Sequence, residues 1–294
     1  MLRGKVIIKR THGLGNLVLL LPVLHRLHHL GWDVTLLTRS EWADVFSQLV
    51  PDIAVTHQVD PDIRPIDLDL ETLAHKPVEH RTLEFARILE VEGPFNAPCL
   101  HVPWEWRREF DSFRNAVLFA PEAGHQAREW PQEHSVQFLQ KARKDYQIVV
   151  AGTRTHPPLP ADHDLRGLLT LRQLIALLAT VKGVISMDSG TLYLAAAIGT
   201  PTLALFGGID PSYRVLPQQK VTVLRTGIAC SPCNKEEVCS GAFACLSGIQ
   251  PEYVLARLET LAKAGARTVC LIPDQQAYPW LSGSAANQNA KRET

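Results

Sequence analysis

The fold of this chain is decided by VKGVISMDSGTLYLAAAIGTPTLALFGGIDP, the stretch from Val181 to Pro211. Its apolar pattern predicts two short buried strands joined by a helix, over residues 184–187, 192–198 and 202–206. The turn Asp188-Ser189-Gly190 precedes the helix, and Gly199-Thr200-Pro201 ends it. Such a turn places hydroxyls, a carboxylate and unpaired backbone N–H groups at a helix N-terminus, where they favour a phosphate or another anion. The alternative is that Asp188 or Ser189 only caps the helix.

Strands and helices alternate along both halves of the 294-residue chain, which is typical of α/β proteins with parallel sheets. We expect strands over residues 6–8, 34–37, 53–55, 117–119, 147–151, 184–187, 202–206 and 221–224. Further helices are expected over residues 17–30, 41–49, 80–92 and 252–264. Residues 60–69 are expected to form a loop, and residues 93–105, with three prolines, a linker. The chain is therefore predicted to form two Rossmann-like domains with parallel sheets facing a central cleft, over residues 1–105 and 106–281, before a disordered tail over residues 282–294.

The run D-S-G-T-L-Y-L-A-A-A-I-G-T-P from Asp188 resembles the nucleotide-binding signature of glycosyltransferase family 9, the bacterial lipopolysaccharide heptosyltransferases. Three other stretches agree with the family in order and spacing: residues 5–24, 119–133 and 165–174. The resemblance implies the GT-B fold and inverting transfer of a sugar from a nucleotide donor, ADP-linked, to a glycan, lipid-linked glycan or protein acceptor. The predicted first domain is short, which leaves little room for the insertions that relatives use to hold a lipid-linked acceptor.

The resemblance also implies a set of donor-binding residues: Gly13, Gly15, Gly124, Arg128, Asp188, Ser189, Gly190, Thr191, Leu192 and Tyr193. Backbone N–H groups at the helix start would stabilise a diphosphate leaving group, so no metal is expected for catalysis. Arg128 stands where the family has a cation that binds the diphosphate. The alternative is that Arg128 is an ordinary surface arginine of a loop. Tyr193 stands where many relatives have a histidine. It is expected either to contact the sugar or to pack in the core as an aromatic side chain of the helix. The acidic residue that would bind the ribose is not identified, and Asp162 and Asp164 are the candidates nearest in sequence.

The first glycine loop departs from the family at Asn16, where relatives usually have an aspartate that deprotonates the acceptor hydroxyl. An amide has no useful proton affinity, so Asn16 cannot act as a general base. His12, four residues earlier in the same loop, is the candidate substitute, unless it is simply solvated. Otherwise Asn16 orients the acceptor while transfer runs slowly, or the protein is a catalytically degenerate relative that binds a sugar nucleotide or serves as a scaffold.

Four cysteines, Cys230, Cys233, Cys239 and Cys245, lie within sixteen residues in the spacing C-x2-C-x5-C-x5-C. Thiols this close suit a structural zinc or iron ion, or an iron–sulfur cluster. A reducing compartment disfavours disulfides between them. Some members of the resembled family carry a similar cluster, and certain protein-modifying heptosyltransferases bind iron there. The alternative is four free thiols that pack a loop.

Composition argues against several other classes of protein. Thirty basic residues balance thirty acidic ones, which gives no electrostatic reason to expect nucleic acid or more than peripheral association with a membrane. Basic residues interrupt the apolar run at the N-terminus, so we expect no signal peptide and a cytoplasmic protein. A dinucleotide-dependent oxidoreductase is disfavoured because Val18 stands at the third glycine position of that fingerprint.

Overall fold

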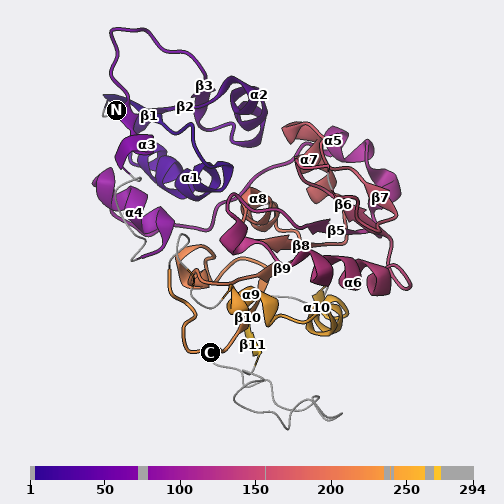
Figure 1. The fold of residues 1–294 in the computed structure, drawn as a ribbon. Coiled ribbons are helices and arrows are strands. Elements are labelled where there is room, and N and C mark those ends of the chain that lie inside the picture. The colour runs from indigo at the N-terminus through magenta and orange to yellow at the C-terminus, as the bar shows by residue number, and fades with distance from the viewer. Residues whose placement is uncertain are drawn as a thin grey trace.

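The computed structural model describes residues 4–71, 79–155, 157–234, 239, 242–261 and 268–272. These residues form two β-sheets, each packed with helices (Figure 1). Every strand pairing that the described residues make is parallel, which confirms the expected α/β class. The predicted tail over residues 282–294 lies outside the described residues, and the division into domains at residue 105 stays a prediction.

The first sheet has the strand order β3-β2-β1-β4. Its strands are β1 (Gly4–Lys9), β2 (Trp32–Leu37), β3 (Ala54–Thr56) and β4 (Ile66–Asp67). Its helices are α1 (Leu14–His29), α2 (Ser40–Leu49), α3 (Leu68–Glu71) and α4 (Arg81–Ile88). The expectation of a loop over residues 60–69 is therefore wrong, because β4 and the start of α3 fall inside it. A strand of two residues is too short to show an alternating pattern, and its pairing with β1 is what defines it.

The second sheet has the strand order β11-β10-β9-β8-β5-β6-β7. Its strands are β5 (Val117–Ala120), β6 (Ile148–Val150), β7 (His163–Asp164), β8 (Gly183–Met187), β9 (Thr202–Leu205), β10 (Val221–Thr226) and β11 (Thr268–Ile272). The α-helices of this half are α5 (Trp104–Arg108), α6 (Gln132–Ala142), α7 (Leu171–Leu178), α8 (Gly190–Ile198), α9 (Ala244–Ser247) and α10 (Pro251–Leu258). The strands predicted in this half are confirmed, whereas β7 and β11 were not expected. No helix within the described ranges is long and apolar enough to cross a membrane.

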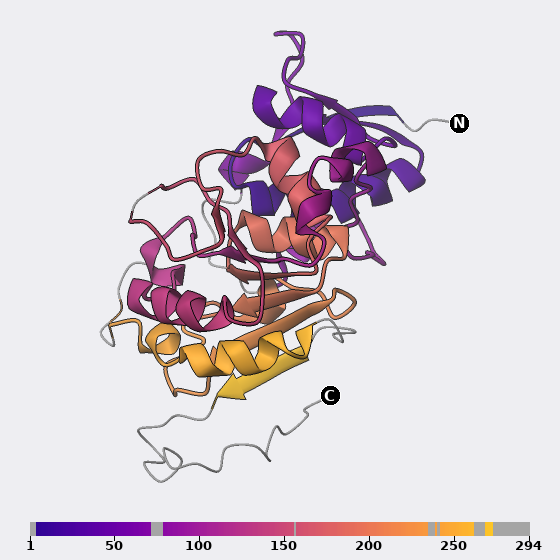
Figure 2. The same ribbon diagram turned by 90° about the vertical axis from the view of Figure 1, so that its right-hand side faces the viewer.

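Alternate side chains of the second sheet face two different apolar layers. On β5, Leu118 belongs to the layer that contains α1 and α8, whereas Val117 and Phe119 belong to the layer that contains α6 and α10. Helices α6 and α10 lie side by side over that second layer (Figure 2), and Lys141 of α6 pairs with Glu252 of α10. Burial of both faces explains why the central strands are almost entirely apolar.

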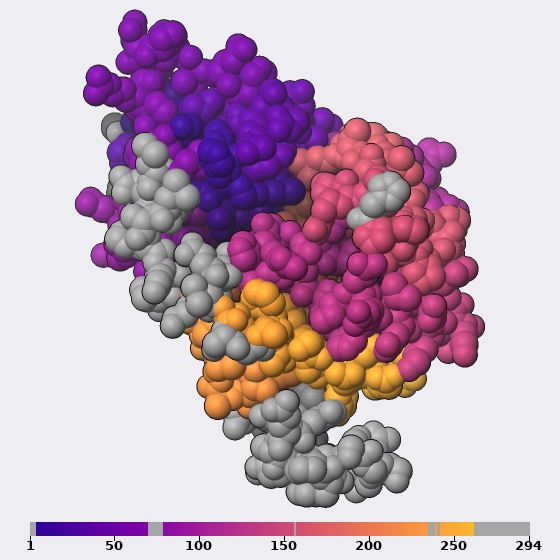
Figure 3. Space-filling view, in the orientation of Figure 1, coloured from indigo at the N-terminus to yellow at the C-terminus, as the bar shows by residue number. Residues whose placement is uncertain are grey.

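One apolar core runs through both halves of the molecule. Helix α1 is buried over residues 17–24 and packs against α8 of the second half. The chain between the halves also touches α8, because Leu100 N donates to Ala197 O at 3.0 Å. Figure 3 shows the indigo first half in direct contact with the magenta part of the second half.

The two halves meet most tightly where α1 and α8 begin. A Cβ atom added to Gly15 would lie only 2.2 Å from Cδ2 of Tyr193, and one added to Gly190 would lie 3.4 Å from Cβ of Leu14. The ring of Tyr193 therefore lies directly on the backbone of α1. This contact fixes the distance between the two helix N-termini.

We expect Gly15→Ala to lower the free energy of unfolding by about 1–3 kcal/mol, because the added methyl group overpacks the contact with Tyr193. Alanine is otherwise the better helix former by up to about 1 kcal/mol. In a Tyr193→Ala background the same substitution is therefore expected to be neutral or stabilising. Urea unfolding of the four proteins measures both effects, and equal destabilisation in the two backgrounds would contradict the contact.

Candidate functional site

Each sheet reverses its strand order next to a central strand. The reversal lies between β1 and β4 in the first sheet and between β5 and β8 in the second. Ligands of open parallel sheets bind beyond the carboxyl ends of the strands at such a point. Residues 10–13 follow β1 and residues 188–190 follow β8, so both glycine turns lie at these points. The contact between α1 and α8 brings the two turns together.

The N-termini of both helices lack a side-chain cap among the described residues. Ser189 occupies the N-cap position of α8, but its hydroxyl lies 3.2 Å from Oγ of Ser186 and does not cap the helix. Gly13 is the N-cap of α1 and has no side chain to offer. The interpretation of Asp188 or Ser189 as a simple helix cap is therefore wrong.

Two helix N-termini that meet in this way concentrate positive potential. Each carries the equivalent of roughly half an elementary charge, and neither first turn contains an acidic residue. Arg214 and Arg128 add full positive charges close to Tyr193. Burial, and then the charge of Asp188, raises the pKa of Tyr193 well above its ordinary value, while the two arginines oppose that rise. An anion is the ligand that this arrangement favours.

Asp188 is held at the centre of this region. Its side chain is buried, and Oδ1 accepts a hydrogen bond from the Tyr193 hydroxyl. Nη1 of Arg128 lies 3.5 Å from Oδ2 of Asp188 and donates to its carbonyl oxygen at 3.3 Å. A Cβ atom at Gly124 would lie 3.2 Å from Nη2 of Arg128. The structure thus brings together Gly124, Arg128, Asp188 and Tyr193, and Arg128, with 22% of its side chain exposed, is not a free surface residue.

A buried carboxylate that the sequence analysis missed, Asp69, anchors the first glycine loop. It accepts hydrogen bonds from Thr11 N at 3.0 Å, Thr11 Oγ1 at 2.6 Å and His12 N at 3.0 Å, and Nε of Arg10 lies 3.6 Å away. Burial alone would raise the pKa of Asp69, but the hydrogen bonds from Thr11 and His12 outweigh it and hold the pKa below the ordinary value of 3.8. Asp69 is therefore ionised at neutral pH. The only sequence signal for Asp69 was that an acidic residue ends the segment 60–69, which was expected to form a loop.

The two candidates for the general base are placed differently. Asn16 is half-buried and folds back over the loop, since a Cβ atom at Gly13 would lie 3.0 Å from Nδ2 of Asn16. Gly13 has φ of 70°, a left-handed conformation that favours glycine. His12 has 69% of its side chain exposed, and its Nδ1 lies 3.3 Å from Oδ2 of Asp69. His12 is thus an accessible imidazole beside a buried carboxylate.

The two acidic residues considered for the ribose are engaged locally. Asp162 accepts from Ile148 N at 2.8 Å and pairs with Arg143 at 2.9 Å, while Asp164 pairs with Arg166 at 2.6 Å. Both lie at or next to β7, the edge strand of the second sheet. The structure does not bring either of them to the glycine turns.

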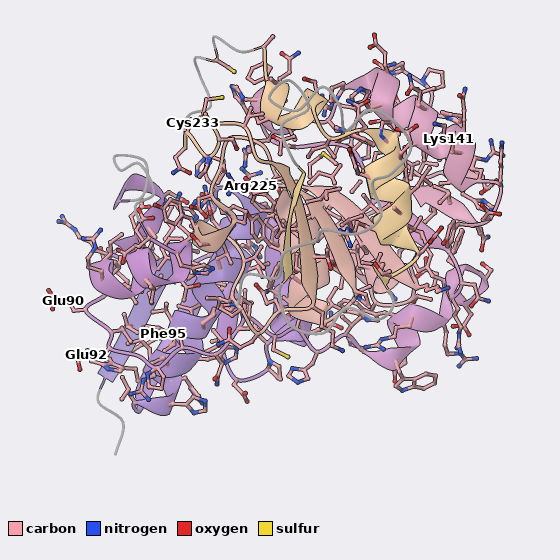
Figure 4. All side chains as sticks on the ribbon, turned by 90° about the horizontal axis from the view of Figure 1, so that it is seen from below. Glu90, Glu92, Phe95, Lys141, Arg225 and Cys233 are labelled. Carbon is pink, nitrogen blue, oxygen red and sulfur yellow. The ribbon has the colours of Figure 1, made fainter. Side chains whose placement is uncertain are left out.

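Three of the four clustered cysteines are exposed, Cys230, Cys233 and Cys239, whereas Cys245 is buried. Burial, and then the neighbouring thiols of the other three, raises the pKa of Cys245 to about 11. The four thiols therefore share one region, and Figure 4 shows Cys233 and Arg225 in the same part of the molecule. Within the described residues, however, no three His, Cys, Asp or Glu side chains are arranged to hold a metal ion.

Comparisons with known proteins identify relatives of this chain. Residues 77–242 match the model of glycosyltransferase family 9 (heptosyltransferase). Lipopolysaccharide heptosyltransferase 2 of Salmonella typhimurium is 28% identical over 184 residues, 58% of this chain and 51% of that protein. The protein of the same name from Escherichia coli gives the same identity and coverage. The chain spans about half the length of these curated relatives.

Two solved structures share the fold. ADP-heptose LPS heptosyltransferase II of E. coli matches with a TM-score of 0.62 and 16% identity, over 88% of this chain and 98% of that one. The iron-containing dodecameric glycosyltransferase TibC from enterotoxigenic E. coli matches with a TM-score of 0.70 and 17% identity, over 89% and 76% of the two chains. These likenesses confirm the expected GT-B architecture. Because the family model covers more than half of its residues, the chain belongs to glycosyltransferase family 9.

Proposed function

We propose that this protein transfers a sugar, with inversion, from an ADP-linked heptose donor to a glycan, lipid-linked glycan or protein acceptor. The observation that carries the proposal is the meeting of two uncapped helix N-termini beside Arg128, which suits a diphosphate. The curated relatives are lipopolysaccharide heptosyltransferases, and TibC is known in complex with ADP-D-β-D-heptose. These likenesses favour ADP-heptose as the donor and a lipopolysaccharide-type acceptor.

On the donor side, the leaving group is a nucleoside diphosphate whose charge grows as the glycosidic bond breaks. Backbone N–H groups at residues 190–192 and the guanidinium of Arg128 would stabilise that charge without a metal. Asp188 would contact the sugar, and its bonds to Tyr193 and Arg128 already fix its orientation.

On the acceptor side, the attacking hydroxyl must lose a proton. We assign this role to His12, because its imidazole is exposed in the first glycine loop, whereas Asn16 cannot accept a proton. The acceptor oxygen forms its bond to the anomeric carbon, the bond to the diphosphate breaks, and the hydroxyl proton moves to His12. Attack opposite the leaving group inverts the anomeric configuration.

A catalytically degenerate protein that binds a sugar nucleotide, or acts as a scaffold, is the second candidate function. The observation that favours it is Asn16, which occupies the base position of the family. Binding of the donor is common to both candidates, and only transfer distinguishes them.

Calorimetric titration with ADP, GDP, UDP and CDP is expected to show selective binding of ADP. Arg128→Ala is expected to weaken binding about tenfold or more, because a charge-assisted hydrogen bond contributes about 1.5–3 kcal/mol. Arg114→Ala is the matched control, since that exposed arginine pairs with Asp111 at 2.9 Å. A protein that binds none of the four nucleotides would contradict both candidate functions.

With ADP-heptose and a lipopolysaccharide inner-core acceptor, His12→Gln is expected to lower kcat about 10²- to 10⁴-fold, the usual range for a lost general base. His57 is an exposed histidine that directly follows β3, at the carboxyl ends of the strands of the same sheet. Its substitution His57→Gln is expected to leave kcat unchanged. ADP release measures the rate. Adding Asn16→Asp to His12→Gln is expected to restore part of the activity. If neither the wild type nor Asn16→Asp transfers heptose while both bind ADP, the protein is the degenerate relative.

We further propose that the four clustered cysteines hold a structural zinc or iron ion or an iron–sulfur cluster. The shared region of the four thiols and the iron content of TibC support this assignment. The described geometry does not close such a site, so binding would have to draw the thiols together.

Elemental analysis of the purified protein is expected to find about one equivalent of zinc or iron, which Cys230→Ser with Cys233→Ser removes. Cys99→Ser, an exposed cysteine elsewhere in the chain, is the control. Less than about a tenth of an equivalent of metal, with all four thiols titrating freely, would overturn the assignment.

A further inference from the structure

The first glycine loop is held rigidly from two sides. On one side, Nε of Arg39 donates to the carbonyl oxygen of Thr11 at 2.6 Å. On the other side, Asp69 accepts from the backbone N–H groups of Thr11 and His12, both at 3.0 Å. Asp69 lies in α3, directly after β4, and is 57 residues away from His12 in the chain. The position of the His12 backbone is therefore set by tertiary contacts.

The direction of the hydrogen bond between the Thr11 hydroxyl and Asp69 follows from the charge of the carboxylate. Oγ1 of Thr11 lies 2.6 Å from Oδ2 of Asp69, and an ionised carboxylate only accepts. The hydroxyl therefore donates to Asp69, which leaves Oγ1 as an acceptor. Nδ1 of His12 lies 3.2 Å from that same Oγ1.

Both neighbours of Nδ1 are thus acceptors. Besides Oγ1 of Thr11, Oδ2 of Asp69 lies 3.3 Å from Nδ1. A nitrogen between two acceptors is favoured when it carries the proton, so neutral His12 takes the Nδ1–H tautomer. The lone pair then resides on Nε2, at the far side of a ring that has 69% of its side chain exposed.

Asp69 cannot be the base itself. Its side chain is buried, its pKa is lowered, and its oxygens already accept hydrogen bonds from Thr11 and His12. A carboxylate in this state keeps its charge and does not take up the proton of a substrate hydroxyl. Its charge next to Nδ1 does, however, stabilise the imidazolium that forms when Nε2 accepts a proton.

We infer that Asp69 and Thr11 are positioning residues that fix the tautomer of His12, so that Nε2 is the atom that receives the proton of the acceptor hydroxyl. In the transfer step Nδ1 keeps its proton, Nε2 gains one, and Asp69 stays ionised throughout. The inference rests on the proposed function in one respect only, which is that Nε2 of His12 accepts a proton during transfer. The tautomer itself is a property of the resting protein.

Nitrogen-15 NMR of the full chain labelled at histidine tests the tautomer directly. The His12 signals are assigned by their absence from His12→Gln. The wild type is expected to show predominantly the Nδ1–H form. Thr11→Val, which keeps the shape but removes the hydroxyl, and Asp69→Asn, which removes the charge, are expected to shift the population toward Nε2–H. Thr11→Ser retains the hydroxyl and is expected to match the wild type.

Asp33→Asn is the control for Asp69→Asn, because Asp33 is exposed at the amino end of β2, away from the glycine turns. In the transfer assay Thr11→Val is expected to lower kcat about tenfold and Asp69→Asn about 10²-fold, with the KM for ADP-heptose unchanged. Thr11→Ser and Asp33→Asn are expected to keep the wild-type kcat.

The two readouts separate two kinds of failure. A wild-type His12 in the Nε2–H form, or a tautomer that neither Thr11→Val nor Asp69→Asn changes, would overturn the inference even in an active enzyme. A fixed Nδ1–H tautomer that depends on Thr11 supports the positioning network, whatever the rate of transfer. A wild type with that tautomer and no transfer would count against the proposed function instead.

Discussion

Two helix N-termini meet between the sheets, and the rest of the site depends on that contact. Helix α1 starts soon after β1 and α8 soon after β8, so both dipoles present their positive ends to the same place. The approach is possible because residue 15 is a glycine, since any side chain there would collide with Tyr193. Repulsion between the two helix ends is offset by the carboxylates of Asp69 and Asp188. The same arrangement suits a diphosphate, because its charge reinforces that offset.

A buried ion pair in α4 lies close enough to this contact for Tyr193 to act on its arginine. Arg81 pairs with Glu84 at 2.5 Å with both side chains nearly inaccessible, and burial lowers the pKa of Arg81. Taking charges out of water is costly, and removing one partner leaves the other unpaired at a cost of about 3–5 kcal/mol. Such pairs contribute little net stability, yet they hold their groups in one geometry. Preorganised charges of this kind are what stabilises a leaving group when no metal takes part.

The turn at Asp188 could be predicted from the sequence because its signal is local. Strand, turn and helix lie within 31 consecutive residues, and the apolar pattern and the glycines suffice to place Asp188 at a helix start. Asp69 could not be predicted in the same way. Its role depends on the pairing of β4, two residues long, with β1, and on hydrogen bonds to a loop 57 and 58 residues away. The edge strand β7, which is also two residues long, was not predicted for the same reason. Contacts that depend on long-range pairing leave no periodic pattern in the sequence.

The asparagine at position 16 does not by itself exclude transfer activity. An aspartate at this position would supply both a negative charge and an accessible proton acceptor. In this chain the charge is present at Asp69, in α3 directly after β4, and the proposed proton acceptor is His12. Asp69 is too well solvated by hydrogen bonds to accept a proton, and His12 alone has no fixed tautomer. Thr11 links them, since its one hydroxyl donates to Asp69 and accepts from His12. Loss of the aspartate is thus compatible with a base built from three residues, in which charge and proton affinity reside on different side chains.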